Sequence, residues 1–171
     1  ALDADIRAHF HDGILWVGLG TTPNIVAHLG RWGTLLGLPE SHASSRNGEQ
    51  LALSVRSMIG ARKMLLVIDD AWKLEDALLF QIGGAECVHL VTTRIPSLAT
   101  ALASDTPLIL NELNPEQSLD LLHVLAPQIV QREPQSAYAL VQAVGGLPLA
   151  LTLAGNYLRL QTASGQMRRV Y

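Results

Sequence analysis

The chain has 171 residues, of which 49% are hydrophobic and 16% charged, and its formal net charge is −3. This composition supports one ordinary domain, or one domain with a small appendage, and excludes a largely disordered chain. The slightly acidic balance argues against sequence-independent nucleic-acid binding, which requires a basic surface, and the single cysteine excludes an intrachain disulfide framework or a cysteine zinc cluster.

Neither a membrane span nor a signal peptide is visible in the sequence. No apolar stretch approaches the roughly 20 residues that cross a bilayer, and the first residues, ALDADIRAHFHDG, are polar and acidic. We therefore expect a soluble, cytoplasmic protein that does not associate with membranes. Because the chain lacks an initiator methionine and begins in mid-pattern, we also expect it to be part of a longer protein.

From residue 14 to about residue 111, segments of strand length alternate with segments of helix length. Short apolar runs predict strands over residues 14–17, 64–68, 87–91 and 108–110. The spacing of apolar residues predicts helices over residues 22–36, 49–59, 74–80 and 97–102, with a polar loop over 41–48. This alternation is typical of parallel strands joined by crossover helices, which form a layered α/β sheet.

The pattern changes after Leu113, beyond which no strand is predicted. Asn114, Pro115 and Gln117 suit the N-cap, first and third positions of a helix, with the glutamine placed to reach back to the cap. Helices are predicted near residues 115–131, 135–144 and 148–160. We therefore expect an α/β part over residues 1–113 and a small helical part over residues 114–171.

Two adjacent carboxylates, Asp69 and Asp70, end the apolar run MLLVI. Open parallel sheets bind ligands at this edge, beyond the carboxyl ends of their strands. One carboxylate there can hold Mg²⁺, usually with water, and its neighbour can polarise an attacking water. The alternative is a strand that simply ends in polar residues, and the pattern alone does not decide between the two.

The segment HLVTTR, residues 89–94, places two hydroxyls and the guanidinium of Arg94 at the end of the next strand. A guanidinium is a planar fork that suits phosphate oxygens, and the threonine hydroxyls can order water at the same edge. The alternative is a surface arginine beside threonines that are good strand formers. His89 lies within the strand, and we interpret it as structural.

The segment GGLPLAL, residues 145–151, is a corner between two helices. Its two glycines end one helix, where glycine readily takes a positive φ, and Pro148 takes the first position of the next. Whether Pro148 also touches a ligand does not follow from the pattern.

The segment GLGTT, residues 18–22, lies between a predicted strand and a predicted helix, as phosphate loops do. A Walker-type loop, however, requires G-x-x-x-x-G-K-[ST], whose lysine reaches the phosphates. The only lysines in the chain are Lys63 and Lys73, and neither follows a glycine. We therefore do not interpret this segment as a phosphate loop.

Taken in this order, the motifs resemble those of the NB-ARC domain, the signalling ATPase module of the STAND class of P-loop NTPases. LLVIDDAW resembles the Walker B segment of that family, HLVTTR its sensor strand, LNELNPEQSLDLL the start of its helical ARC subdomain, and GGLPLAL its GLPL motif. ILWVGLG resembles the strand after the family's first helix, and the resemblance spans about residues 8–160. It implies a P-loop-NTPase-like parallel sheet followed by a helical ARC-type subdomain.

In that family, the domains bind ADP and exchange it for ATP to change from a closed monomer to an open oligomer. The resemblance implies that Asp69 organises Mg²⁺ and that Asp70 assists hydrolysis. It also implies that Arg94 senses the γ-phosphate and that Pro148 packs near adenine. For the longer protein it implies an ATPase that self-associates on activation and carries effector or sensor domains, with no direct nucleic-acid binding by this segment.

The family's first strand and Walker A loop are missing from this chain, and ALDADIRAHFHDG resembles the end of the helix that follows them. That strand is central in the family, so we expect a gap in the sheet. We also expect the chain alone to bind nucleotide weakly or not at all, because it lacks the N–H groups and the lysine of the phosphate loop.

Two alternatives belong to other functional classes. The first is a degenerate, nucleotide-free interaction module that keeps the NB-ARC shape. The second is a receiver-type phosphoacceptor domain, which also uses an acidic pair at a strand end. Receivers need a further aspartate on a middle strand and a lysine after the last strand, and this chain has no lysine beyond Lys73.

Overall fold

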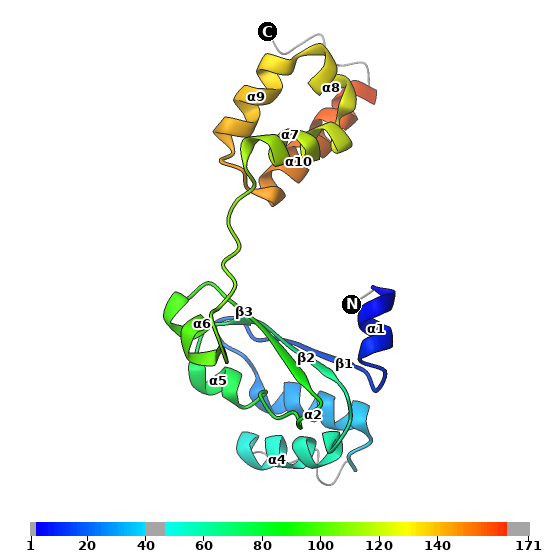
Figure 1. Ribbon diagram of the computed structural model, residues 1–171, viewed down its shortest axis with the longest axis vertical. Coiled ribbons are helices and arrows are strands. Elements are labelled where there is room, and N and C mark those ends of the chain that lie inside the picture. Colours follow the sequence, from blue (N-terminus) through cyan, green and yellow to red (C-terminus); the bar gives the residue numbers. More distant parts are fainter. Residues whose placement is uncertain (1–2, 40–46, 164–171) are drawn as a thin grey trace. The chain divides into compact units, whose positions relative to one another are not determined.

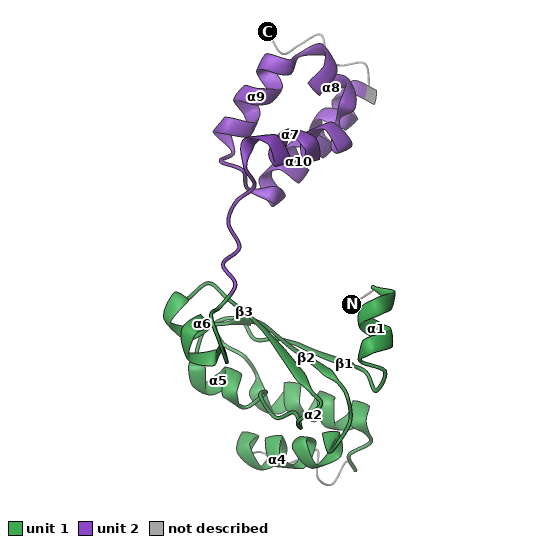
Figure 2. Ribbon diagram, in the orientation of Figure 1, with its two compact units in different colours: residues 1–107 green, residues 108–171 purple. Residues whose placement is uncertain are grey.

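The structure is a computed structural model that describes residues 3–39 and 47–163. The chain divides into two compact units, residues 1–107 (unit 1) and residues 108–171 (unit 2), shown in Figure 2. The predicted domain boundary at residue 113 falls a few residues later, and the assignment of separate functional domains stays a prediction. Most of the predicted loop over 41–48 lies outside the described residues.

Unit 1 is built around a three-stranded parallel sheet with the strand order β1-β2-β3 (Figure 1). The strands are β1 (Ile14–Gly18), β2 (Leu65–Ala71) and β3 (Val88–Thr93). The helices of this unit are α1 (Ala4–His9), α2 (Ile25–Leu36), α4 (Gly48–Ile59), α5 (Leu74–Leu78) and α6 (Pro96–Leu102). Parallel strands joined by crossover helices confirm the predicted α/β fold class.

The core of unit 1 includes alternate residues of the strands together with side chains of α2 and α4. Its buried side chains include Leu15, Val17, Leu29, Trp32, Leu51, Val55, Ile59, Leu66 and Ile68. The indole N–H of Trp32 donates to the carbonyl oxygen of Trp16 at 3.2 Å, and its ring meets the ring of Phe80 edge-on, with 5.1 Å between centroids. The three- and four-residue spacing in the sequence therefore marks the helix faces that contribute to the core.

The other set of alternating strand residues is only partly covered. Val67 on the central strand is buried, but Trp16 is 53% exposed, Val88 49% and Leu90 51%. Parallel sheets are ordinarily covered by helices on both faces. This sheet therefore keeps an apolar surface, which we call the open face, formed by Trp16, Val88 and Leu90.

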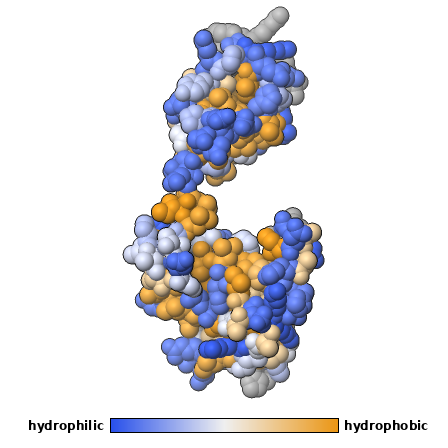
Figure 3. Space-filling view, in the orientation of Figure 1, coloured by the Kyte–Doolittle hydropathy of each residue, from blue (hydrophilic) through white to orange (hydrophobic). Residues whose placement is uncertain are grey.

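The predicted strand over residues 108–110 is wrong. This segment is not in a strand, and its side chains Leu108, Ile109 and Leu110 are 87%, 76% and 87% exposed. Hydrophobic residues gather in the segment that enters unit 2 (Figure 3). A strand forms only where its N–H and C=O groups find a partner, and within the described residues no strand pairs with this triplet.

In the described residues, unit 2 contains α7 (Pro115–Leu125), α8 (Pro127–Arg132), α9 (Pro134–Ala143) and α10 (Pro148–Ala163). The single helix predicted over 115–131 is two helices, because Pro127 has no N–H to donate and its ring clashes with the preceding turn. The predicted cap of α7 is confirmed. The Asn114 side chain accepts from the Gln117 N–H at 2.9 Å, and the Gln117 side chain accepts from the Asn114 N–H at 3.1 Å.

The corner between α9 and α10 is formed by Gly145 and Gly146, whose φ angles of +61° and +70° confirm the predicted positive values. Gly146 also lies against the segment before α7. The Leu113 N–H donates to the Gly146 carbonyl at 3.0 Å. Leu122, Ala137, Val141 and Leu151 form the buried core of this unit. None of the helices in the described ranges is long and apolar enough to span a bilayer.

We expect His89 to make the stability of unit 1 dependent on pH. Burial lowers the pKa of His89 below 6.5, and its Nε2 accepts a hydrogen bond from the Gly83 N–H at 3.3 Å. As the pH falls below about 6.5, the unfolded chain binds the proton first, so the free energy of unfolding falls. Urea midpoints followed by tryptophan fluorescence should drop more on acidification in the wild type than in His89→Gln. Equal drops in the two proteins would contradict this role.

Candidate functional site

The predicted site residues of unit 1 lie at the carboxyl ends of two neighbouring strands, β2 and β3 (Figure 1). Asp69 and Asp70 are the fifth and sixth residues of β2, and both are partly exposed. Thr92 and Thr93 end β3, and Arg94 follows at once. Because the strands are parallel and adjacent, these side chains share one edge of the sheet.

The pairing of β2 with β3 becomes irregular at the two aspartates. Ile68 pairs with Val91, and the next pair is Ala71 with Thr93, so two residues of β2 face Thr92 alone. Asp70 has φ +54°, the only positive value among the described non-glycine residues. Bulges of this kind re-aim side chains and are common next to functional sites.

The hydroxyl of Thr92 fills the gap in the strand pairing. It donates to Asp69 Oδ1 at 2.5 Å and accepts from the Asp70 N–H at 2.9 Å. Asp69 Oδ2 has no partner within the described part of the chain. The carboxylate of Asp69 is therefore held through one oxygen and open at the other.

The carbonyl groups of the two aspartates face β1. The Leu19 N–H donates to the Asp69 carbonyl at 2.9 Å, and the Gly20 N–H donates to the Asp70 carbonyl at 3.0 Å. These N–H groups of the GLGTT segment therefore extend the strand pairing and are not free for a phosphate. This agrees with the interpretation that the segment is not a phosphate loop.

Arg94 lies beside the acidic pair but is held weakly. Its Nη2 is 3.5 Å from Asp70 Oδ1, and its side chain is 77% exposed. The guanidinium also lies over the ring of Trp72, 5.7 Å from the centroid. Exposed ion pairs and exposed cation–π contacts contribute about 0–1 kcal/mol each. Arg94 can therefore leave Asp70 for a stronger anion at little cost.

The structure thus brings Asp69, Asp70 and Arg94 together, whereas Pro148 belongs to unit 2, where it begins α10. Sequence reasoning did not find the part played by Thr92. We expected the threonine hydroxyls to order water, but those of Thr92 and Thr93 bond to β2. This contact depends on the register between β2 and β3. The local sequence pattern does not predict that register.

The donor set at this edge suits a cation that is completed by water and phosphate. No group of three or more histidine, cysteine, aspartate or glutamate side chains that could cage a metal occurs in the described residues. Mg²⁺ is usually bound through one or two carboxylates, with water and substrate phosphates as the other ligands. The open oxygen of Asp69 fits that pattern.

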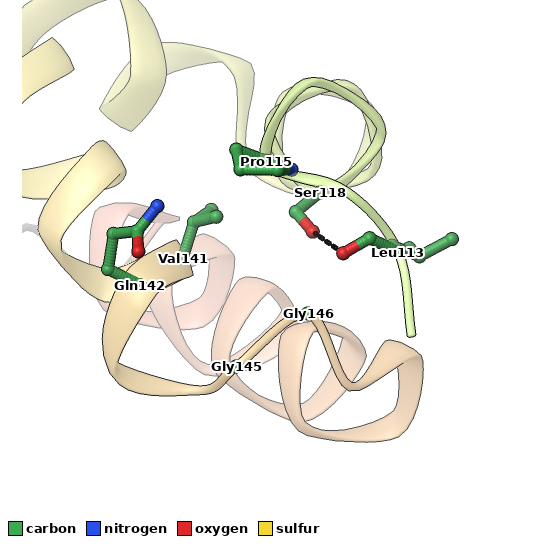
Figure 4. A pocket seen from close by; sticks show the side chains of 7 residues that line it. All are labelled: Leu113, Pro115, Ser118, Val141, Gln142, Gly145 and Gly146. Atoms are coloured by element: carbon green, nitrogen blue, oxygen red, sulfur yellow. Dashed lines mark hydrogen bonds between the residues drawn. The ribbon is translucent and has the colours of Figure 1, made fainter. Parts of the chain in front are cut away.

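Unit 2 has a small pocket of its own beside the glycine corner (Figure 4). Its volume is about 190 Å³, and its lining residues are Leu113, Pro115, Ser118, Val141, Gln142, Gly145 and Gly146. The buried hydroxyl of Ser118 donates to the Leu113 carbonyl at 3.4 Å. Ligand pockets are commonly about 300–1,000 Å³, so this hollow is smaller than a typical ligand site.

A parallel sheet with crossover helices is consistent with the P-loop-NTPase-like class of α/β proteins. Residues 2–130 match the NB-ARC domain. The chain belongs to the NB-ARC family, whose members are nucleotide-binding signalling modules, and this confirms the resemblance seen in the motifs.

Relatives come from bacteria, plants and animals. Regulatory protein AfsR of Streptomyces griseus is 31% identical over 159 residues, covering 89% of this chain and 16% of the relative. Disease resistance protein RPS5 of Arabidopsis thaliana is 26% identical, covering 85% of this chain and 17% of the relative. Apoptotic protease-activating factor 1 of Rattus norvegicus is 26% identical, covering 88% of this chain and 12% of the relative. The chain therefore spans less than a fifth of the length of each of these relatives.

Proposed function

We propose that this chain supplies the Walker B and sensor side of an ADP/ATP-binding signalling switch. The observation that supports it is the convergence of two carboxylates and a weakly held guanidinium at the carboxyl ends of β2 and β3. Asp69 is the magnesium-organising residue, Asp70 assists hydrolysis, and Arg94 senses the γ-phosphate.

Each role follows from how the side chain is held. Asp69 keeps one oxygen open for a hydrated cation, and bound Mg²⁺ would neutralise charge on phosphate oxygens. The carboxylate of Asp70 can orient a water and accept its proton once Arg94 moves away. Arg94 exchanges a loose ion pair for charge-assisted, bidentate hydrogen bonds to a phosphate, which are considerably stronger.

The remaining features of the switch concern unit 2 and the longer protein. Pro148 packs near adenine when nucleotide is bound. Exchange of ADP for ATP opens the protein and allows it to self-associate, and linked effector or sensor domains read the change. A cytoplasmic location suits such a switch. The family relationship and the GGLPLAL corner support this part of the proposal.

The test is calorimetric titration of ADP and of ATP with Mg²⁺, using this chain and the longer protein that contains it. The chain alone should bind weakly or not at all, and the longer protein should bind both nucleotides. In the longer protein, Asp69→Ala should lower the Mg²⁺-dependent part of ATP affinity at least about tenfold, because its metal ligand is lost. Glu75→Ala removes an exposed carboxylate from the first turn of α5 and is the matched control.

The outcomes distinguish the nucleotide-binding switch from the nucleotide-free interaction module. Unchanged Mg·ATP binding by Asp69→Ala would refute the metal role. A longer protein that binds neither nucleotide would overturn the switch and support the nucleotide-free interaction module instead. Arg94→Ala should weaken ATP but not ADP, and equal loss for both nucleotides would refute the sensor role.

A further inference from the structure

Among the described residues, Thr92 is the side chain that hydrogen-bonds to both members of the acidic pair. It donates to the carboxylate of Asp69 at 2.5 Å and accepts from the backbone of Asp70 at 2.9 Å. A hydroxyl has one proton and two lone pairs, so it can donate and accept at the same time. One oxygen atom therefore couples the carboxylate of Asp69 to the backbone of Asp70.

The contact to Asp70 accounts for the backbone conformation at the bulge. The extra residue of a bulge is left without a partner in the strand ladder, and the Thr92 hydroxyl supplies the missing acceptor for the Asp70 N–H. With φ at +54°, Asp70 occupies the left-handed region, which aspartate tolerates better than most residues. The hydroxyl thus holds a conformation that strand pairing alone does not favour.

The contact to Asp69 restricts its carboxylate. Carboxylates that bind metals are themselves commonly hydrogen-bonded by a neighbouring group, which fixes their orientation. Here the bond occupies Oδ1 and leaves Oδ2 as the open ligand. The rotation of the carboxylate is limited before any cation arrives, so less freedom is lost on binding.

We propose that Thr92 is a positioning residue of this site. Its hydroxyl orients Asp69 toward the cation and keeps Asp70 in its left-handed conformation. The inference rests on the proposed function, because it takes Asp69 as the residue that faces Mg²⁺. According to this inference, the site requires a hydroxyl on the adjacent strand in addition to the two aspartates.

The next residue provides an internal comparison. The Thr93 hydroxyl donates to the Ala71 carbonyl at 2.7 Å and accepts from the Ile95 N–H at 3.1 Å. Both of its partners are backbone groups, and neither belongs to Asp69 or Asp70. Thr93 therefore has a structural role, and the same substitution there measures the loss of a strand-end hydroxyl without loss of the site contact.

The first measurement uses the 171-residue chain without nucleotide. Hydrogen exchange of the Asp70 amide, followed by NMR, should be several-fold faster in Thr92→Val, because the amide loses its acceptor. Thr92→Ser should restore slow exchange, and Thr93→Val should leave the Asp70 amide unchanged. Thr92→Ala serves as a second hydroxyl-free variant if the valine variant does not fold. An Asp70 amide that exchanges equally fast with and without the Thr92 hydroxyl overturns the proposal.

The second measurement uses the longer protein and Mg²⁺ with ATP. Thr92→Val should lower the Mg²⁺-dependent part of ATP affinity about tenfold, Thr92→Ser should recover it, and ADP binding without Mg²⁺ should not change. If Asp69→Ala weakens Mg·ATP binding but Thr92→Val does not, the positioning role alone fails. If Asp69→Ala also has no effect, the proposed metal role fails as well.

Discussion

Replacing Gly146 by alanine is expected to lower the free energy of unfolding of unit 2 by about 3 kcal/mol. Its φ of +70° lies in the left-handed region, where a side chain costs about 1–2 kcal/mol. The added Cβ would also lie 2.2 Å from the carbonyl oxygen of Leu113. That oxygen belongs to the backbone, and moving it away strains the hydrogen bond from the Leu113 N–H to the Gly146 carbonyl.

Gly145 is the matched control for this substitution. Its φ is +61°, but a Cβ there meets nothing within 4 Å, so Gly145→Ala should cost only about 1–2 kcal/mol. The three tryptophans, at positions 16, 32 and 72, all belong to unit 1. Tryptophan fluorescence therefore follows unit 1, while far-UV circular dichroism also follows the helices of unit 2.

The expected result for Gly146→Ala is a loss of helical signal at a temperature lower by more than about 10 °C, as expected for a unit of this size. The tryptophan transition should stay in place. If both glycine variants shift the helical signal equally, the close approach to Leu113 is not a constraint, and only the left-handed backbone matters at this corner.

Replacing Phe80 by alanine should lower the free energy of unfolding of unit 1 by about 3–5 kcal/mol. Phe80 is 0% exposed, and its ring packs edge-on against Trp32, with 5.1 Å between centroids. The substitution removes an aromatic pair and leaves a cavity in the core. The midpoint of urea unfolding, followed by tryptophan fluorescence, measures the loss.

Leu78→Ala is the control for Phe80→Ala because the two residues are close in the chain and both substitutions remove apolar atoms. Leu78 is 50% exposed, so its loss should cost less than about 1.5 kcal/mol. Should the alanine variant of Phe80 not fold, Phe80→Leu should show a smaller loss in the same direction. Equal costs at the two positions would show that the ring pair is not a major part of the core.

Much of the fold was predictable because local pattern and tertiary contact agree. Strands of a parallel sheet are commonly short apolar runs, and those over 14–17, 64–68 and 87–91 correspond to β1, β2 and β3. The run over 108–110 is equally apolar, but it pairs with no strand among the described residues. A strand forms only beside another strand that pairs with it, and the sequence of the triplet does not show whether such a strand is present.

The candidate site was predictable in part for a similar reason. Because parallel strands end at one edge, the sequence predicted that Asp69, Asp70 and Arg94 lie together. The bulge that gives Thr92 its two contacts arises from a shift in pairing between strands, which periodicity does not show. The roles of the site residues, including Pro148, stay predictions for the binding experiments.

The outer edge of β3 has a consequence for the chain in solution. No strand in the described part of the chain pairs with that edge, and the sequence VHLVTT carries no lysine, glutamate or proline to discourage addition of another strand. Val88 and Leu90 of the open face lie on the same strand and are about half exposed. β3 therefore presents the kind of unpaired, largely apolar strand edge to which a further strand can add.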